Sequence, residues 1–182
     1  RDNLFTTETV FGIASYFARV NYDYAGRYLF SATARYDGSS RFGANNRFGF
    51  FPSASVGWRV SEEAFLRGNR LINDLKLRAS WGKTGNQQIG NFVSRGSLAI
   101  GADYNGQGGV VPAANGLPNP DLSWESTTQF DVGIDLALLN NRLTLTADYY
   151  HKRTDDLLFN RVIPTQTGYN SIAVNLGSIE NK

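Results

Sequence analysis

The sequence predicts an all-β fold, an antiparallel meander of about seven long strands that forms part of a larger transmembrane β-barrel. Three observations predict it. Apolar and polar residues alternate with a period of two through most of the chain, which places one set on each face of a sheet. The runs are about ten residues long, the length of a tilted membrane-spanning strand and roughly twice that of a soluble strand. The connections between the runs are unequal, short at one end and long at the other.

The hairpin at 128–152 is the clearest of these patterns. Its first strand runs from Thr128 to Leu138, and its second runs from Leu143 to Lys152 after a turn at 139–142. The apolar face holds Phe130, Val132, Ile134, Leu136, Leu138, Leu143, Leu145, Ala147 and Tyr149. The opposite face carries the acids Asp131, Asp135 and Asp148. The two faces therefore need different surroundings, one apolar and one aqueous.

The same period occurs in four earlier runs and one later run. The earlier runs cover residues 12–23, 28–37, 52–60 and 75–82. The hairpin supplies the fifth and sixth strands, and a seventh is expected to start near Ser171 and to continue to the end of the chain. Residues 92–100 fit either a further strand or a loop.

The connections sort by length. The turns at 24–26 and 140–141 are short, and a medium link at 61–74 belongs to the same end. In that link Ser61 is a helix N-cap residue type followed by acids, which predicts one helical turn over 61–66. The alternate connections at 38–47, 85–125 and 154–170 are long. Outer-membrane barrels separate short turns from long loops in this way.

A soluble antiparallel β-sandwich is the alternative fold, because it also alternates polar and apolar residues. Strand length and loop sorting favour the barrel. So do the aromatic residues Tyr22 and Tyr28 beside a short turn and Tyr36 at the far end of its strand, since a barrel has aromatic girdles at both interfaces. Charges spaced regularly along the polar face suit a wet lumen, namely Arg19, Arg35, Arg59, Lys76, Arg78, Asp131, Asp135 and Asp148.

Composition narrows the function classes. The chain has 182 residues, with Lys+Arg 18 and Asp+Glu 16 and no basic cluster, so nucleic acid is not an expected partner. Cysteine is absent, which excludes disulfides and thiolate metal sites. Seven strands cannot close a bacterial barrel, and an open sheet edge is not viable in hydrocarbon. We therefore expect residues 1–182 to be one segment of a larger barrel, without a signal peptide.

Candidate chemical residues are few, and each has a structural interpretation that we prefer. His151 is the only histidine and is expected at a rim, because one histidine without cysteine makes a metal site improbable. Asp155 and Asp156 have no calcium-loop spacing, so they are interpreted as solvated loop residues. Glu62 and Glu63 are interpreted as charges at a helix N-terminus.

The remaining candidates are aromatic or glycine-rich. Residues 106–109 lack the Lys-Ser/Thr of a phosphate loop and are expected to form a mobile surface loop. Tyr104 in the same region is a weak candidate for stacking on a sugar ring. Trp58 and Trp81 are expected to face lipid. We therefore predict no catalytic, cofactor-binding or metal-binding residue, and no cofactor; substrate-binding residues cannot be assigned from the sequence.

Several ordered stretches resemble one protein family. They are Phe50–Val60, Leu75–Asn86, Asn119–Glu125, Asp148–Tyr150, Asp155–Leu158 and Asn175–Lys182. Together they are similar to the C-terminal half of the barrel of SusC/RagA-type TonB-linked outer-membrane proteins of the Bacteroidetes. The resemblance implies a 22-stranded barrel in the outer membrane, an N-terminal plug that this segment lacks, and import of large nutrients. It also implies a SusD-like surface lipoprotein as a lid, and energy from TonB with ExbB and ExbD through the missing N-terminal part.

Three functional hypotheses follow. The leading one is TonB-energised import of oligosaccharides, other glycans or peptides with a SusD-like lipoprotein. A second keeps the membrane barrel but changes the cargo to a siderophore or cobalamin. A third is a soluble β-sandwich for adhesion or carbohydrate binding. An enzyme is not expected, because no nucleophile and base are recognisable together.

Overall fold

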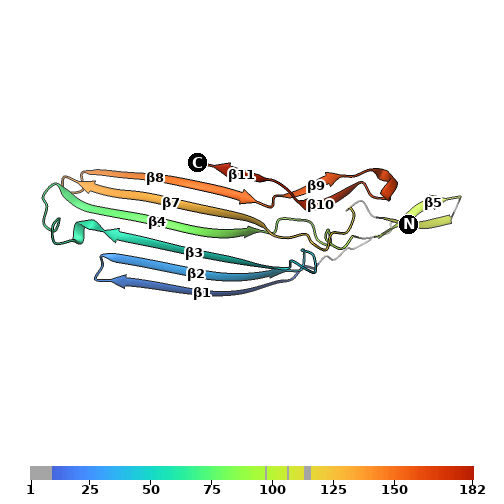
Figure 1. Cartoon of the computed structure of the whole chain (residues 1–182), viewed down its shortest axis with the longest axis horizontal. Helices are drawn as coiled ribbons and strands as arrows, with labels where there is room; N and C mark the ends of the chain where they lie inside the picture. Colours follow the sequence, from blue (N-terminus) through green and yellow to red (C-terminus); the bar gives the residue numbers. More distant parts are fainter. Residues whose placement is uncertain (1–9, 97, 106, 113–115) are drawn as a thin grey trace, which may run out of the picture.

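The computed structural model describes residues 10–96, 98–105, 107–112 and 116–182. Its main element is a seven-stranded antiparallel sheet in which the strands follow the order β1-β2-β3-β4-β7-β8-β11 (Figure 1). The strands are β1 (Ile13–Tyr24), β2 (Tyr28–Ser39), β3 (Phe48–Arg59), β4 (Ile72–Asn86), β7 (Glu125–Leu138), β8 (Leu143–Asp155) and β11 (Ser178–Asn181). The all-β meander predicted from the alternating pattern is confirmed.

Two small ribbons stand apart from this sheet at the end opposite the short turns (Figure 1). One pairs β5 (Leu98–Tyr104) with β6 (Gln107–Pro112), and the other pairs β9 (Leu158–Val162) with β10 (Ser171–Asn175). Two single-turn 3₁₀ helices complete the fold, η1 (Val60–Glu62) and η2 (Thr165–Thr167). Among the described residues, no helix has the length and apolar character needed to span a membrane.

The short connections are tight because their residues accept left-handed backbone. Ala25 and Gly26 have positive φ between β1 and β2, and the Asp23 carboxylate accepts a hydrogen bond from the Gly26 amide at 2.8 Å. Between β7 and β8, Leu139, Asn140 and Asn141 all have positive φ. Asparagine tolerates this conformation better than most residues, which explains why so short a turn joins two strands of this length.

The antiparallel register sorts the side chains onto two faces. One row across the sheet contains Tyr24, Tyr28, Trp58, Leu77, Ile134 and Ala147. The neighbouring row on the other face contains Asp23, Leu29, Gly57, Arg78, Gly133 and Asp148. Large side chains of the apolar face stay exposed, such as Phe130 at 43% and Leu145 at 56%. In the described part of the chain no second sheet covers them, so the β-sandwich prediction is wrong.

The apolar band crosses the sheet obliquely. On β1, β2 and β3 it ends at Tyr24, Tyr28 and Trp58, but on β7 it continues from Ile134, which shares their row, to Leu138. On β7 the band therefore extends four residues (138 minus 134) beyond that row. Tilted strands, as in a membrane barrel, offset an apolar band in this way.

The end of the chain differs from the prediction. The expected seventh strand from Ser171 onward divides at Gly177, whose φ is +81°. Residues Ser171–Asn175 leave the main sheet and pair with β9, and only β11 joins β8. The reason is that β10 has a partner within the predicted loop 154–170, which itself contains β9. Within the range 92–100, residues 92–95 form a turn and residues 98–100 begin β5, while Ser97 lies outside the described residues.

Two local predictions are also corrected. Ser61 caps no helix: η1 begins after Arg59 without a side-chain cap, and the Ser61 hydroxyl donates instead to the Asp74 carboxylate at 2.9 Å. Within the expected mobile loop 106–109, residues 107–109 belong to strand β6, and Gly106 lies outside the described residues. Pairing with β5 satisfies the backbone of this glycine-rich segment.

Charged substitutions test the assignment of the apolar and polar faces of the sheet. Arginine introduced at Ile134 or Leu145 in the full-length parent should destabilise the barrel by up to roughly 2–4 kcal/mol, because both side chains lie on the apolar face and the cost is largest at the bilayer midplane. Arginine at Gln129 or Thr146, on the polar face of the same hairpin, should cost much less. Heat-modifiable gel mobility of membrane fractions reports the folded fraction. Equal losses at all four positions would contradict the two faces.

Candidate functional site

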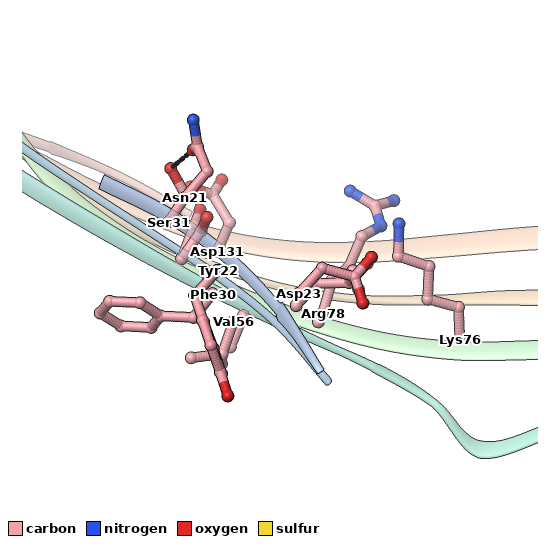
Figure 2. A pocket seen from close by; sticks show the side chains of 15 residues that line it. Asn21, Tyr22, Asp23, Phe30, Ser31, Val56, Lys76, Arg78 and Asp131 are labelled. Carbon is pink, nitrogen blue, oxygen red and sulfur yellow. Dashed lines mark hydrogen bonds between the residues drawn. The ribbon is translucent and has the colours of Figure 1, made fainter. Parts of the chain in front are cut away.

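A hollow on the polar face is the most developed concave feature of the main sheet. It has a volume of about 480 Å³, and its floor crosses β1, β2, β3, β4 and β7. Figure 2 shows Asn21, Ser31, Asp131, Lys76 and Arg78 on one side of the strands and Phe30 and Val56 on the other. The hollow exists because the polar-face rows beneath it contain small residues, namely Ser31, Ser55, Gly57, Ser80 and Gly133.

Arg78 organises the charges at one border of the hollow. Its Nε lies 3.1 Å from Asp135 Oδ2 on β7, and its Nη2 lies 2.7 Å from Asp148 Oδ1 on β8. The register places Arg78 beside Gly133 and Gly133 beside Asp148. A Cβ on Gly133 would meet the Arg78 Cζ at 2.8 Å and would also contact the Asp148 carboxylate. The glycine therefore provides the path by which one guanidinium spans three strands.

The other polar groups of the hollow bond mainly to one another. The Ser80 hydroxyl donates to Asp131 at 3.1 Å, and the Ser31 hydroxyl donates to the Asn21 amide oxygen at 2.8 Å. Asp131 also accepts a hydrogen bond at 2.8 Å from the amide of Gln129, which lies beside the hollow. Lys76 has no ion pair within 4.0 Å among the residues that the structure describes. The surface thus offers hydroxyls, an amide and one cation to a polar ligand, which suits hydrogen bonding to sugars or to peptide groups.

The long connections are held together by a compact hydrophobic cluster, which we term the loop knot: Phe42, Phe51, Leu122, Trp124 and Ala173. Leu122 is fully buried at 0% exposure. The Trp124 ring lies 4.7 Å from the Phe42 ring and 5.3 Å from the Phe51 ring between centroids. Because Phe51 pairs with Arg35, it belongs to the polar face, so the loop knot covers the far end of that face.

Two asparagines fasten the loop knot through backbone groups. Asn175 accepts from the Ser123 amide at 2.8 Å and donates to the Ser123 carbonyl at 2.9 Å. Asn119 donates to the Ala173 carbonyl at 2.8 Å. Trp124 Nε1 donates to the Arg47 carbonyl at 3.0 Å. The segment Asn119–Glu125 is therefore a structural clasp between loops, a role that no local sequence pattern reveals because its partners are distant in sequence.

At the short-turn end, Glu63 accepts three hydrogen bonds. Its donors are the Tyr28 hydroxyl at 2.6 Å, Trp58 Nε1 at 3.1 Å and Arg27 Nη1 at 3.3 Å. The bond from Tyr28, then that from Trp58, hold the pKa of the Glu63 carboxyl below its ordinary value. Glu62 lies in the first turn of η1 as predicted, whereas Glu63 is its C-cap residue, so the interpretation of Glu63 as a helix N-terminal charge is wrong. The Glu63 carboxylate instead fixes the link between β3 and β4 to the aromatic end of β2 and β3.

The histidine and aspartate candidates form no common site. His151 pairs with Phe130 on the apolar face, at its far end, and its ring contacts the Glu180 carboxylate. Asp155 forms an ion pair with Arg153 at 2.8 Å, and Asp156 turns the chain with a φ of +58°. Within the described residues, no group of three His, Cys, Asp or Glu side chains is arranged to hold a metal ion.

The aromatic candidates lie apart. Trp58 and Trp81 are on the apolar face, in the rows of Ile134 and Phe130 respectively. Tyr104 is the last residue of β5, and its side chain lies outside the described residues.

The loop knot and the Glu63 contacts were not expected from the sequence. The Asn119–Glu125 stretch carried a usable signal, since it already stood out in the family resemblance.

Comparison with known proteins gives consistent matches over nearly the whole chain. Residues 2–182 match the family model described as "TonB dependent receptor-like, beta-barrel". The chain is 47% identical over 177 residues to TonB-dependent receptor P39 of Formosa agariphila, covering 97% of this chain and 17% of that protein. It is 42% identical over 175 residues to TonB-dependent receptor SusC of Bacteroides thetaiotaomicron, covering 93% of this chain and 17% of SusC.

Solved structures also match most of the chain. A structure of the RagAB peptide transporter matches with a TM-score of 0.84 and 32% identity, covering 93% of this chain and 19% of that chain. A RagAB peptide importer in a "closed-closed" state matches with a TM-score of 0.82 and 33% identity, covering 92% of this chain and 18% of that chain. The chain thus spans less than a fifth of the length of these relatives.

Gly133→Ala should weaken the contact between Arg78 and Asp148, since the new methyl group occupies the path of the guanidinium. The full-length variant should melt at a lower temperature in low salt, and the difference should shrink as salt screens the lost ion pair. Gly57→Ala is the matched control in the same row, because its Cβ would make only ordinary contacts of 3.4–3.5 Å. A salt-independent loss in Gly133→Ala would show that Arg78 is not involved.

Leu122→Ala should loosen the loop knot by about 2–5 kcal/mol, because it removes a fully buried side chain. Hydrogen exchange of the full-length parent should then accelerate at 42–47 and 171–175 while β1 and β2 keep their protection. Leu139→Ala, at an exposed turn position, is the control. Unchanged exchange in the loops would mean that the cluster does not hold them together.

Proposed function

The chain belongs to the β-barrel family of TonB-dependent receptors, and we propose that it forms one part of the wall of an importer for large nutrients. Its likeness to SusC and to RagAB places it near the SusC/RagA members of that family, which are outer-membrane transporters and not enzymes. The observation that carries the proposal is the seven-stranded sheet, which matches RagAB with a TM-score of 0.84 and 32% identity.

In the wall of a barrel, the two faces of the sheet have different surroundings. The exposed apolar face contacts lipid, and the polar face lines the lumen through which cargo passes. In this arrangement the hollow at Asn21, Ser31, Lys76 and Arg78 is part of the lumen wall. We propose that residues 1–182 are one segment of this barrel, and that the plug and the TonB-contacting part lie elsewhere in the parent protein.

The proposed cargo is an oligosaccharide, another glycan or a peptide. Two facts support this breadth: a relative at 42% identity is SusC, and the matching structures are of a peptide transporter. The hydroxyls and the amide of the polar face suit either cargo, since sugars and peptide groups both donate and accept hydrogen bonds. A SusD-like lipoprotein is the proposed lid, and TonB with ExbB and ExbD is the proposed energy source.

Uptake of a siderophore or cobalamin is the alternative within the same family. A growth experiment distinguishes this alternative from import of a glycan or peptide. A strain without the full-length gene should fail to grow on one glycan or peptide as sole nutrient and should grow normally when iron is scarce. Failure under iron limitation alone would replace the nutrient proposal with the siderophore alternative.

The hollow can be tested in the same strain by complementation. Lys76→Gln should raise the cargo concentration needed for half-maximal uptake by up to roughly tenfold, because it removes a charged hydrogen-bond donor from the lumen wall. Lys83→Gln is the matched control on the same strand, since Lys83 shares the apolar-face row of Thr128 and Arg153. Equal effects of the two variants would contradict a role for the hollow in cargo passage.

A further inference from the structure

The link between β3 and β4 exposes apolar side chains at the short-turn end of the sheet. Phe65 is 72% exposed and Leu71 is 62% exposed. Leu139, in the neighbouring β7–β8 turn, and Leu143, at the start of β8, are also more than half exposed. The Leu139 amide donates to the Leu71 carbonyl at 3.0 Å, so the link and the turn are physically joined. Figure 1 shows the link beside this turn at the left of the sheet.

Three arginines accompany these apolar residues. Arg67 and Arg70 lie on the link, Arg142 lies in the turn, and all three are exposed. Within the described part of the chain, none of the three has a carboxylate within 4.0 Å. Three acids lie near these arginines. Glu63 forms an ion pair with Arg27 at 3.3 Å, Asp74 accepts a hydrogen bond from the Ser61 hydroxyl at 2.9 Å, and Glu62 is an exposed carboxylate on the link.

The link is an ordered structure held at both of its ends. The Leu66 and Arg67 amides donate to the Glu63 carbonyl at 3.0 Å and 2.8 Å. The Asn69 side chain accepts from the Leu71 and Ile72 amides at 2.8 Å and 3.3 Å. Asn73 in turn accepts from the Asn140 and Asn141 amides. Phe65, the leucines and the arginines therefore occupy defined positions relative to the strands.

This surface continues the lipid-facing side of the barrel. Leu143 pairs with Leu138, and both belong to the apolar face. The aromatic side chains Tyr24, Tyr28 and Trp58 border it, with ring centroids 6.3 Å and 6.5 Å apart along the series. Aromatic residues mark the headgroup level of a membrane. Basic side chains at that level attract anionic lipid, whereas apolar side chains beside them enter the acyl boundary.

We propose that Phe65, Leu71, Arg67, Arg70 and Arg142 form a binding site for anionic phospholipid at the short-turn rim of the barrel. The arginines bind the headgroup phosphate, because a guanidinium donates paired hydrogen bonds to phosphate oxygens. Phe65 and Leu71 are in contact with the outer part of the acyl chains. The hydrogen bonds from Tyr28, Trp58 and Arg27 to Glu63 hold the link in the place where both contacts are made.

The test uses the full-length parent in lipid nanodiscs. Native mass spectrometry should detect phosphatidylglycerol bound in preference to phosphatidylcholine when the disc contains equal amounts of both. Each of Arg67→Gln, Arg70→Gln and Arg142→Gln should weaken this binding by about fivefold, and the triple variant by on the order of a hundredfold. The control removes the same charge from the polar face through Arg19→Gln, Arg59→Gln and Lys76→Gln and should leave the lipid preference intact.

A second readout does not depend on assembly of the triple variant. Spin labels at Phe65→Cys and Leu71→Cys, in a cysteine-free parent, should be accessible to oxygen and shielded from a water-soluble relaxant. A label at Thr146→Cys on the polar face provides the aqueous reference. Water-exposed labels at 65 and 71 would overturn the proposal, as would unchanged lipid binding in the arginine variants. The proposal would also be overturned if inorganic phosphate, added to phosphatidylcholine discs, shielded the labels as well as phosphatidylglycerol does. The site would then recognise phosphate without lipid.

Discussion

The structure depends on one constraint, the antiparallel register of six long strands, which shifts at the start of β4 between Ile72 and Asp74. In hydrocarbon an unpaired backbone N–H or C=O has no partner, so every residue of a spanning strand must be bonded to its neighbours. A slip of one residue would exchange the two faces. The row from Asp23 to Asp148 shows what the register accomplishes: it brings Arg78, Gly133 and Asp148 side by side on three strands. The same register aligns the aromatic residues Tyr24, Tyr28 and Trp58 at the short-turn end. It also leaves a hollow where small residues lie side by side on neighbouring strands.

Local periodicity predicted the features that periodicity controls. The six long strands, their two faces and the short turns followed from alternation between residues 12 and 152, and the register confirms them. Residues 171–176 alternate as well as any barrel strand, yet they pair with β9, because partner choice is set by contacts distant in sequence. Ser61 has the residue type of a cap but bonds Asp74 instead. The Tyr28 bond to Glu63 and the Trp124 bond to the Arg47 carbonyl likewise join residues 35 and 77 positions apart, and no local pattern encodes such partners.

The polar face shows how an open surface can coexist with stable strands. Small residues occupy the centre of this face on adjacent strands, at Ser31, Ser55, Gly57 and Ser80, although glycine is a weak strand former. Pairing with strands on both sides compensates for that weak preference, and the missing side-chain volume becomes the hollow. Large side chains cover the long-loop end of this face as the loop knot, and the aromatic residues Tyr24, Tyr28 and Trp58 stand at the short-turn end of the opposite, apolar face. The sheet is thus stabilised at its ends and left open in its middle.

The loop knot has a consequence for how such a barrel can diversify. Phe51 belongs to β3, and the other members of the loop knot come from three connections. Asn119, Trp124 and Asn175 tie those connections through backbone groups. An insertion within any tied stretch would displace all three connections together, so drift in length is confined to stretches that bear no such tie. The turn around η2 is one of these stretches, because it lies beyond the paired residues of β9 and β10. A longer tip would therefore leave the tied base of the connections unchanged.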